Sequence, residues 1–297
     1  MNLDEDKLKK WCLPPSETEK EKIDNAINMI KSAIRDSQEL KELDIEVFVQ
    51  GSYANNTNVK TSSDVDVCIM LKSTFFTEYP SGLGHSDYGF VDGTITYEDY
   101  KNRVLNTLIK KFGSNNVSIG NKSIKIKSNS YHVEADAVVA FLLKNYAIID
   151  SKKPDEYVEG IRFISNSGVR VSNYPKEHIA NGIIKNNATN YAYKKLGRIF
   201  KRLRNEMVDA GLIDGEKISS FLIECLVWNV PNDVINGHIT WISTLKHSIA
   251  YLYNAINNNQ HLEWGEVSER LYLFRGRKWT DEDVKTFLLE LWGYVVV

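Results

Sequence analysis

The spacing of apolar and polar positions divides the chain into a sheet-bearing first part and a helical second part. Residues 45–50 and 65–71 alternate with a period of two, which predicts two strands. Ser16 followed by Glu19 has the form of a capping box and predicts a helix of roughly twenty residues that begins there. Helical spacing over 97–112 predicts a second helix in this part of the chain.

The rest of the first part carries weaker signals. Residues 72–92 are rich in Gly, Ser and aromatic side chains, which indicates an irregular segment. Strands at 124–127 and 131–140 are expected to form a hairpin that turns at 128–130. Further strand candidates lie at 146–149 and 161–165.

The pattern of apolar and polar residues changes near Pro175, and helical periodicity dominates beyond it. Helices are expected at 189–209, 217–228, 239–257 and 280–293. A sheet-bearing lobe followed by a helical lobe is typical of the α+β class. We therefore predict a first domain over 1–180, including the N-terminal helix, and a helical domain over 181–297 that packs against it.

Composition and charge limit the kind of partner. The 297 residues are 42% hydrophobic and 26% charged, as in soluble globular proteins, and the net charge is −2. A protein that grips long nucleic acid usually carries a basic excess, so small substrates are favoured. Three distant cysteines, a polar N-terminus and the absence of a long apolar stretch predict a cytoplasmic protein that needs no membrane.

The chemistry is concentrated in three aspartates. Asp64 and Asp66 flank Val65 in a predicted strand, so they share one face with α-carbons about 6.5 Å apart. Two carboxylates at this spacing repel each other unless a cation lies between them, and a divalent cation with oxygen ligands satisfies that requirement. Asp136 supplies a third acid within an apolar strand, where an ionised carboxylate is costly unless it is paired or binds metal. Glu134 shares the predicted face of Asp136 and is an alternative.

Three such acids on adjacent strands can hold two magnesium ions, for which manganese can substitute. A metal pair stabilises the attacking and leaving oxygens of an in-line phosphoryl displacement. A lone Asp-x-Asp also occurs by chance, and aspartates at strand ends are often solvated turn residues. The ordered combination of strand, Gly51-Ser52, loop, Asp64-x-Asp66 strand and later acid favours catalysis.

These residues resemble the signature of the polymerase-β-like nucleotidyltransferases. Three longer phrases resemble the bacterial cGAS/DncV-like nucleotidyltransferases more narrowly, and within them the CdnE branch. The phrases are VQGSYANNTNVKTSSDVDVCIML, NYPKEHIANGIIKNNATNYAYKKLGRIFKRLRNEM and SSFLIECLVWNVP. The resemblance runs from Trp11 to the tryptophan-rich C-terminal region, and it implies a catalytic lobe with a mixed sheet and a substrate cleft beside a helical lobe.

The resemblance also implies nucleotide-binding residues. Gly51 and Ser52, after Gln50, would cradle the donor triphosphate, because glycine lets backbone N–H groups approach phosphate. Lys194, Arg198 and Lys201 fall on one helical line, which is either a solvated face or a phosphate-binding row.

The resemblance implies specific roles for four positions. Lys201 matches the lysine that contacts the triphosphate, and Ser220 matches its partner on the next helix. Phe221 stacks on a base or is a core residue. Asn166 is expected to select a pyrimidine, with Asn173 as the alternative counterpart and an ordinary turn as the structural alternative.

The activity implied is the synthesis of a cyclic di- or oligonucleotide from nucleoside triphosphates, including UTP or ATP, with release of pyrophosphate. The product would activate a downstream effector in anti-phage signalling, and the enzyme is expected to be a monomer. Two rival hypotheses use the same acids or the same fold: an RNA-tailing or tRNA nucleotidyltransferase, and a nucleotide sensor without catalysis.

Overall fold

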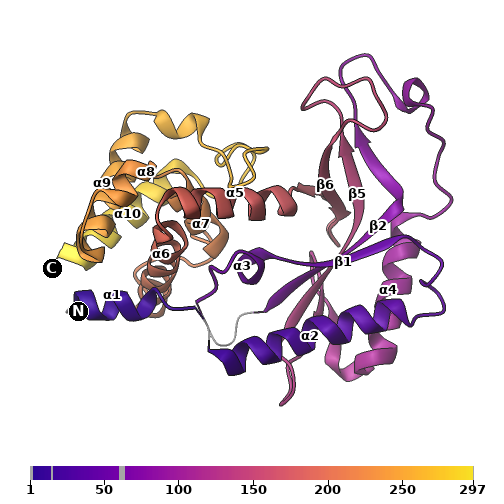
Figure 1. The fold of residues 1–297 in the computed structure, drawn as a ribbon, viewed down its shortest axis with the longest axis horizontal. Helices are drawn as coiled ribbons and strands as arrows, with labels where there is room; N and C mark the ends of the chain where they lie inside the picture. Colours follow the sequence, from indigo (N-terminus) through magenta and orange to yellow (C-terminus); the bar gives the residue numbers. More distant parts are fainter. Residues whose placement is uncertain (1–2, 15, 60–63, 297) are drawn as a thin grey trace. The chain divides into compact units, whose positions relative to one another are not determined.

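The computed structural model describes residues 3–14, 16–59 and 64–296, with the backbone alone for Val296. It contains two compact units (Figure 1). The sheet unit comprises Ser16–Ala54 and Thr61–Lys176, and the helical unit comprises Met1–Pro15, Asn55–Lys60 and Glu177–Val297. This division differs from the predicted domains 1–180 and 181–297, since the N-terminal segment and residues 55–60 belong to the helical unit.

The sheet unit is built on a mixed seven-stranded sheet in the order β1-β2-β5-β4-β3, to which β6 adds beside β5 and β7 beside β6. The β2–β5 pair is parallel and the other pairs are antiparallel, which agrees with the predicted α+β class. The strands are β1 (Ile45–Gln50), β2 (Val65–Glu78), β3 (Val117–Ile119), β4 (Ile124–Ile126), β5 (Ala135–Asn145), β6 (Val158–Ile164) and β7 (Arg170–Asn173).

Helices α2 (Glu17–Arg35) and α4 (Tyr97–Phe112) pack on one face of this sheet (Figure 1). The Ser16 hydroxyl caps α2 by accepting the backbone N–H of Glu19 at 3.3 Å, so the predicted capping helix is confirmed. The bounds of α4 and β1 also coincide with the predicted ranges. The remaining short helices of this unit are α3 (Gly51–Ala54), η1 (His85–Tyr88) and η2 (Ser114–Asn116).

The sheet carries an apolar cluster on each face. Val65, Val67 and Ala137 belong to the cluster under α2 and α4, whereas Cys68 and Val138 belong to a second cluster on the opposite face. Side chains alternate along a strand, so the positions of Asp66 and Asp136 share the second face. The alternation of 65–71 predicted one apolar face, but Cys68 and Met70 are also fully buried, because β2 is a central strand.

The helical unit contains α1 (Glu5–Trp11), α5 (Pro175–Ala188) from Glu177 onward, α6 (Ala192–Asp209), α7 (Ser220–Trp228), α8 (Asn232–Asn236), α9 (Trp241–Asn257), η3 (Gln260–Glu263) and α10 (Asp281–Val296). Helix α6 has an apolar stripe, since Leu196, Ile199, Leu203 and Met207 are fully buried in one core. Helix α7 lies in the same core. Within the described part of the chain, no helix is long and apolar enough to cross a membrane.

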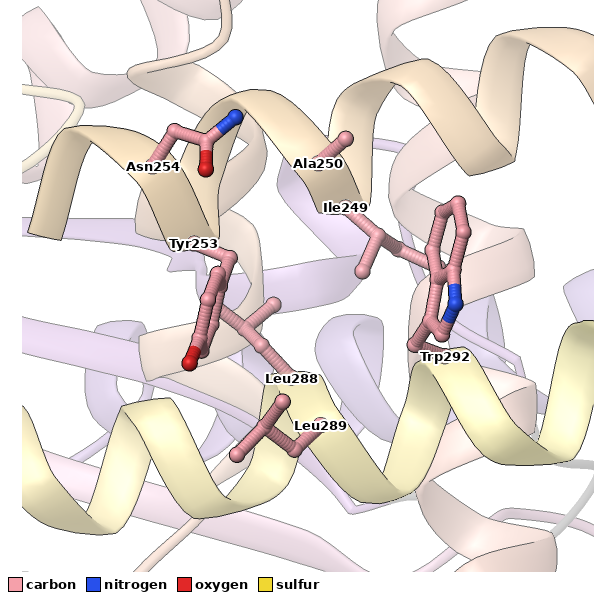
Figure 2. A pocket seen from close by; sticks show the side chains of 7 residues that line it. All are labelled: Ile249, Ala250, Tyr253, Asn254, Leu288, Leu289 and Trp292. Carbon is pink, nitrogen blue, oxygen red and sulfur yellow. The ribbon is translucent and has the colours of Figure 1, made fainter. Parts of the chain in front are cut away.

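The C-terminal helix packs within the helical unit. Val295 is buried in its core, and the Tyr294 hydroxyl donates to Glu206 at 3.3 Å. Helix α10 lies against α9, where Leu289 and Trp292 line a small apolar hollow (Figure 2). Trp292 remains 40% exposed there.

Three local predictions are wrong, and one helix was not predicted. Strand β2 continues to Glu78 past a register shift between Leu71 and Phe75, which breaks the alternation that marks a strand. The expected hairpin turn at 128–130 is replaced by a longer connection from β4 to β5, and 146–149 form a turn instead of a strand. Helix α5 was not predicted, because among its described residues only Gly182 is buried and no apolar stripe marks it.

Candidate functional site: three acids and a glycine turn

The parallel pairing of β2 and β5 brings the predicted acids together. Asp66 and Asp136 are direct partners in the register, and Asp64 immediately precedes β2. Burial raises the pKa of Asp64, and the nearby carboxylates of Glu134 and Asp136 raise it further, while Lys125 opposes them. The charges of Glu134 and Asp136 therefore disfavour the ionised form of Asp64, and its role as a metal ligand stays a prediction.

The glycine turn lies beside this acidic group. Strand β1 ends with Gln50, which pairs with Asp66, and Gly51 follows with a φ of +69°. A Cβ atom on Gly51 would overlap the Asp66 carboxylate. Glycine is thus required both by the backbone angle and by the close approach of the acid, and Ser52 follows in α3.

The donor set fits a divalent cation in its chemistry. Asp136 Oδ1 is buried and accepts no hydrogen bond from any described residue. A buried carboxylate oxygen without a partner is costly, and carboxylates are the ligands that magnesium takes from proteins. The described residues nevertheless contain no group of three His, Cys, Asp or Glu side chains placed to hold a metal, so the two magnesium ions stay a prediction.

The predicted basic row on α6 is not a solvated face. Arg198 is 4% exposed, and its guanidinium donates to the carbonyl oxygens of Cys12, at 2.9 Å from Nε, and of Asn56. It therefore fixes backbone inside the helical unit. Lys194 is partly buried, and burial lowers its pKa.

Lys201 lies in a buried polar network that the sequence analysis missed. Its ammonium is 2.5 Å from Glu224 Oε2 and donates to the Thr57 hydroxyl at 2.9 Å. Burial favours the neutral form of Glu224, but Lys201 and His178 outweigh it and hold the pKa of that carboxyl well below its usual range. The available signal was the position of Glu224, a single charge within the apolar run SSFLIECLVW.

Ser220 and Phe221 begin helix α7, which Ser219 caps by accepting the backbone N–H of Leu222. Phe221 is 39% exposed, so the alternative that it is a core residue is wrong. Its ring lies 6.1 Å from that of His178 and 6.5 Å from that of Trp279. An exposed ring with aromatic neighbours is compatible with base stacking, which stays a prediction.

Asn166 lies in the turn between β6 and β7. Its amide oxygen accepts from Lys101 at 2.5 Å, and its amide nitrogen donates to the Gly120 carbonyl at 2.7 Å. It lines a cavity of about 530 Å³ together with residues of α4, which packs on the face opposite to that of Asp66. These contacts support the structural alternative, a turn former.

Asn173 has a different position. It ends β7 and pairs with Ile161, which belongs to the apolar cluster on the second sheet face. Directly paired residues share a face, so Asn173 projects from the same side of the sheet as Asp66 and Asp136. No side-chain hydrogen bond of Asn173 occurs among the described residues.

The sheet, the paired acids and the glycine turn together define a nucleotidyltransferase fold. Residues 29–114 match a family model described as a nucleotidyltransferase domain, and residues 180–296 match the cGAS/DncV-like nucleotidyltransferase C-terminal helical domain. The chain belongs to the cGAS/DncV-like nucleotidyltransferases.

Three comparisons give this family membership its detail. The chain is 43% identical over 98% of its length to a cyclic dipyrimidine nucleotide synthase CdnE of Cecembia lonarensis, of which it covers 98%. It is 38% identical to a synthase of the same description from Legionella pneumophila, with 99% of each chain covered. A solved structure of the Rhodothermus marinus CdnE c-UMP-AMP synthase is 29% identical with a TM-score of 0.85, covering 98% of this chain and 95% of that one.

Proposed function

We propose that this nucleotidyltransferase joins two nucleoside triphosphates into a cyclic dinucleotide that contains at least one pyrimidine. The observation that carries the catalytic part is the register pair Asp66–Asp136 beside Gly51. The product class is supported by the two relatives described as cyclic dipyrimidine nucleotide synthases, which align over nearly the whole chain.

In the proposed reaction, a 2′ or 3′ hydroxyl of one nucleotide attacks the α-phosphorus of another, the bond to the β-phosphate breaks and pyrophosphate leaves. Asp64, Asp66 and Asp136 would hold divalent cations, whose charge when bound stabilises the attacking and leaving oxygens. We assign to Asp136 a share in deprotonating the attacking hydroxyl, which the cation that it would hold makes more acidic. The same transfer within the linear intermediate closes the ring.

Gly51 and Ser52 are assigned to the donor triphosphate. The positive φ of Gly51 presents backbone N–H groups without a side chain, and Ser52 adds a hydroxyl donor. In the helical unit, Lys201 and Ser220 are assigned to nucleotide phosphate, and Phe221 to a base.

We assign base selection to Asn173 in preference to Asn166. An amide offers a donor and an acceptor, which suits the N3–H and a carbonyl of uracil. The amide of Asn166 is engaged by Lys101 and Gly120, and it lies on the face away from the acids. Asn173 projects from the face that carries the acids.

The test is mass spectrometry of the products formed from a mixture of four triphosphates without RNA. The wild-type enzyme should give a phosphatase-resistant product that contains uridine. Asn173→Ser should shift base choice, and the matched control Asn166→Ser should not. A purely purine product would refute the pyrimidine proposal. In a parallel reaction with RNA, extension of that RNA would favour the tailing hypothesis, and triphosphate binding without turnover in either reaction would favour the sensor hypothesis.

The family resemblance further suggests that the product is an anti-phage signal that activates an effector. Loss of phage protection in cells that carry Asp64→Asn, with the protein still folded and expressed, is the expected result. Unchanged protection would contradict this role without affecting the proposed chemistry.

A further inference from the structure

A single buried carboxylate joins three parts of the helical unit. Glu224 is 5% exposed on α7. Its Oε2 lies 2.5 Å from the Lys201 ammonium and accepts from the Thr57 hydroxyl at 2.7 Å. Its Oε1 lies 3.0 Å from His178 Nε2.

We propose that Glu224 is a positioning residue for the triphosphate, which it serves by orienting Lys201 and by holding Thr57. The proposal rests on the proposed function, in which Lys201 contacts phosphate. The carboxylate itself touches no substrate in this account, and it acts through the two groups that it binds.

Lysine requires such orientation because of its chemistry. Its ammonium is a point charge on a flexible four-carbon stem, and it carries three N–H donors. In Lys201, Glu224 and Thr57 accept two of these donors, which leaves one for a further acceptor such as a phosphate oxygen. Fixing an ammonium before the ligand arrives lowers the entropy that binding must supply.

Thr57 is the second residue that Glu224 holds in place. It is 1% exposed and lies in the segment between Ser52 and Asp64, where Asn55 and Asn58 are also buried. Its hydroxyl accepts from Lys201 and donates to Glu224, so it completes a closed triangle of hydrogen bonds. The carboxylate thus holds both the Lys201 ammonium and the Thr57 hydroxyl.

The second carboxylate oxygen of Glu224, Oε1, binds His178, which lies beside Phe221. His178 bonds to Glu224, and its ring lies 6.1 Å from that of Phe221, the ring assigned to a base. One group therefore arranges a phosphate contact and an aromatic contact within the same unit. A network that served stability alone would have no reason to affect substrate affinity.

The test measures KM, kcat and melting temperature for Glu224→Gln and Thr57→Val. Both variants keep the shape of the side chain, and Thr57→Val retains the Lys201–Glu224 pair. We expect KM for the triphosphate to rise about tenfold in the first and about threefold in the second, with smaller changes in kcat. Loss of folded enzyme alone would lower the apparent kcat at an unchanged KM.

Thr244→Val is the matched control. Thr244 is 3% exposed on α9, and its hydroxyl donates to the Thr240 carbonyl at 3.1 Å, outside the network. It removes a similarly buried hydroxyl, so its KM should equal that of the wild type. A KM within twofold of wild type in both Glu224→Gln and Thr57→Val, or an equal rise in the control, would overturn the positioning role.

Lys201→Met separates this failure from a failure of the proposed function. If Lys201→Met raises KM about tenfold while the Glu224 and Thr57 variants do not, the positioning role alone is wrong. If Lys201→Met leaves KM unchanged, the phosphate role of Lys201 is wrong and the positioning role falls with it.

Discussion

Breaking the Lys201–Glu224 pair from one side should destabilise the protein far more than removing both charges. Lys201 is 2% exposed and Glu224 is 5% exposed, so solvent screens neither charge. Lys201→Met keeps the apolar stem but leaves a buried carboxylate with only Thr57 and His178 as partners. Removing one partner of a buried pair typically costs about 3–5 kcal/mol.

That cost corresponds to a fall in melting temperature of about 5–8 °C for a protein of this size. The double variant Lys201→Met, Glu224→Gln removes both charges, and replacing a whole buried pair is often nearly neutral. Its melting temperature should therefore lie within a few degrees of wild type, as measured by calorimetry or circular dichroism. A double variant as unstable as the single variant, or a single variant as stable as wild type, would refute the reasoning.

Three other predictions follow from the site. Because the pKa of Glu224 is lowered in the folded protein, its carboxylate stabilises the fold above the unfolded pKa of about 4.3, and this contribution is lost as pH falls through and below that value. Acid unfolding of the double variant should lack this component. Identical acid-unfolding profiles of the double variant and wild type would contradict the prediction. The pKa of Asp64 is raised by burial and by neighbouring carboxylates, so Asp64→Asn should raise the melting temperature in EDTA. Added magnesium should stabilise only the wild-type protein. Equal stabilisation of wild type and Asp64→Asn by magnesium would count against the metal site. Gly51→Ala should abolish turnover because the added Cβ would overlap the Asp66 carboxylate. Gly197→Ala is the control and should keep turnover, since a Cβ there meets no atom within 4 Å. Equal activity of the two variants would show that the glycine turn is not required.

Local patterns predicted the elements whose signals are local. Ser16 caps α2, and the bounds of β1 and α4 follow from their periodicity. The sequence predicted that Asp66 and Asp136 lie on adjacent strands, but it did not predict that they pair directly. Strand alternation indicates which face a side chain occupies and does not determine the register between strands.

The parts that the sequence could not predict depend on distant partners. A buried lysine and a solvated lysine give the same pattern on a helix, and the partner of Lys201 is on another helix. Helix α5 lacks an apolar stripe. Asn166 and Asn173 differ in the sheet face that they occupy, and that face follows from the β5–β6–β7 pairing.

The central claim is that the acids catalyse nucleotidyl transfer between triphosphates. Its most direct test is pyrophosphate release, together with formation of a phosphatase-resistant nucleotide, by wild type and by Asp64→Asn, Asp66→Asn without RNA. Wild type should give both products in magnesium and neither in EDTA, and the folded double variant should give neither, because the charge stabilisation of the transition state is lost. Near-wild-type turnover by the folded double variant would contradict the account.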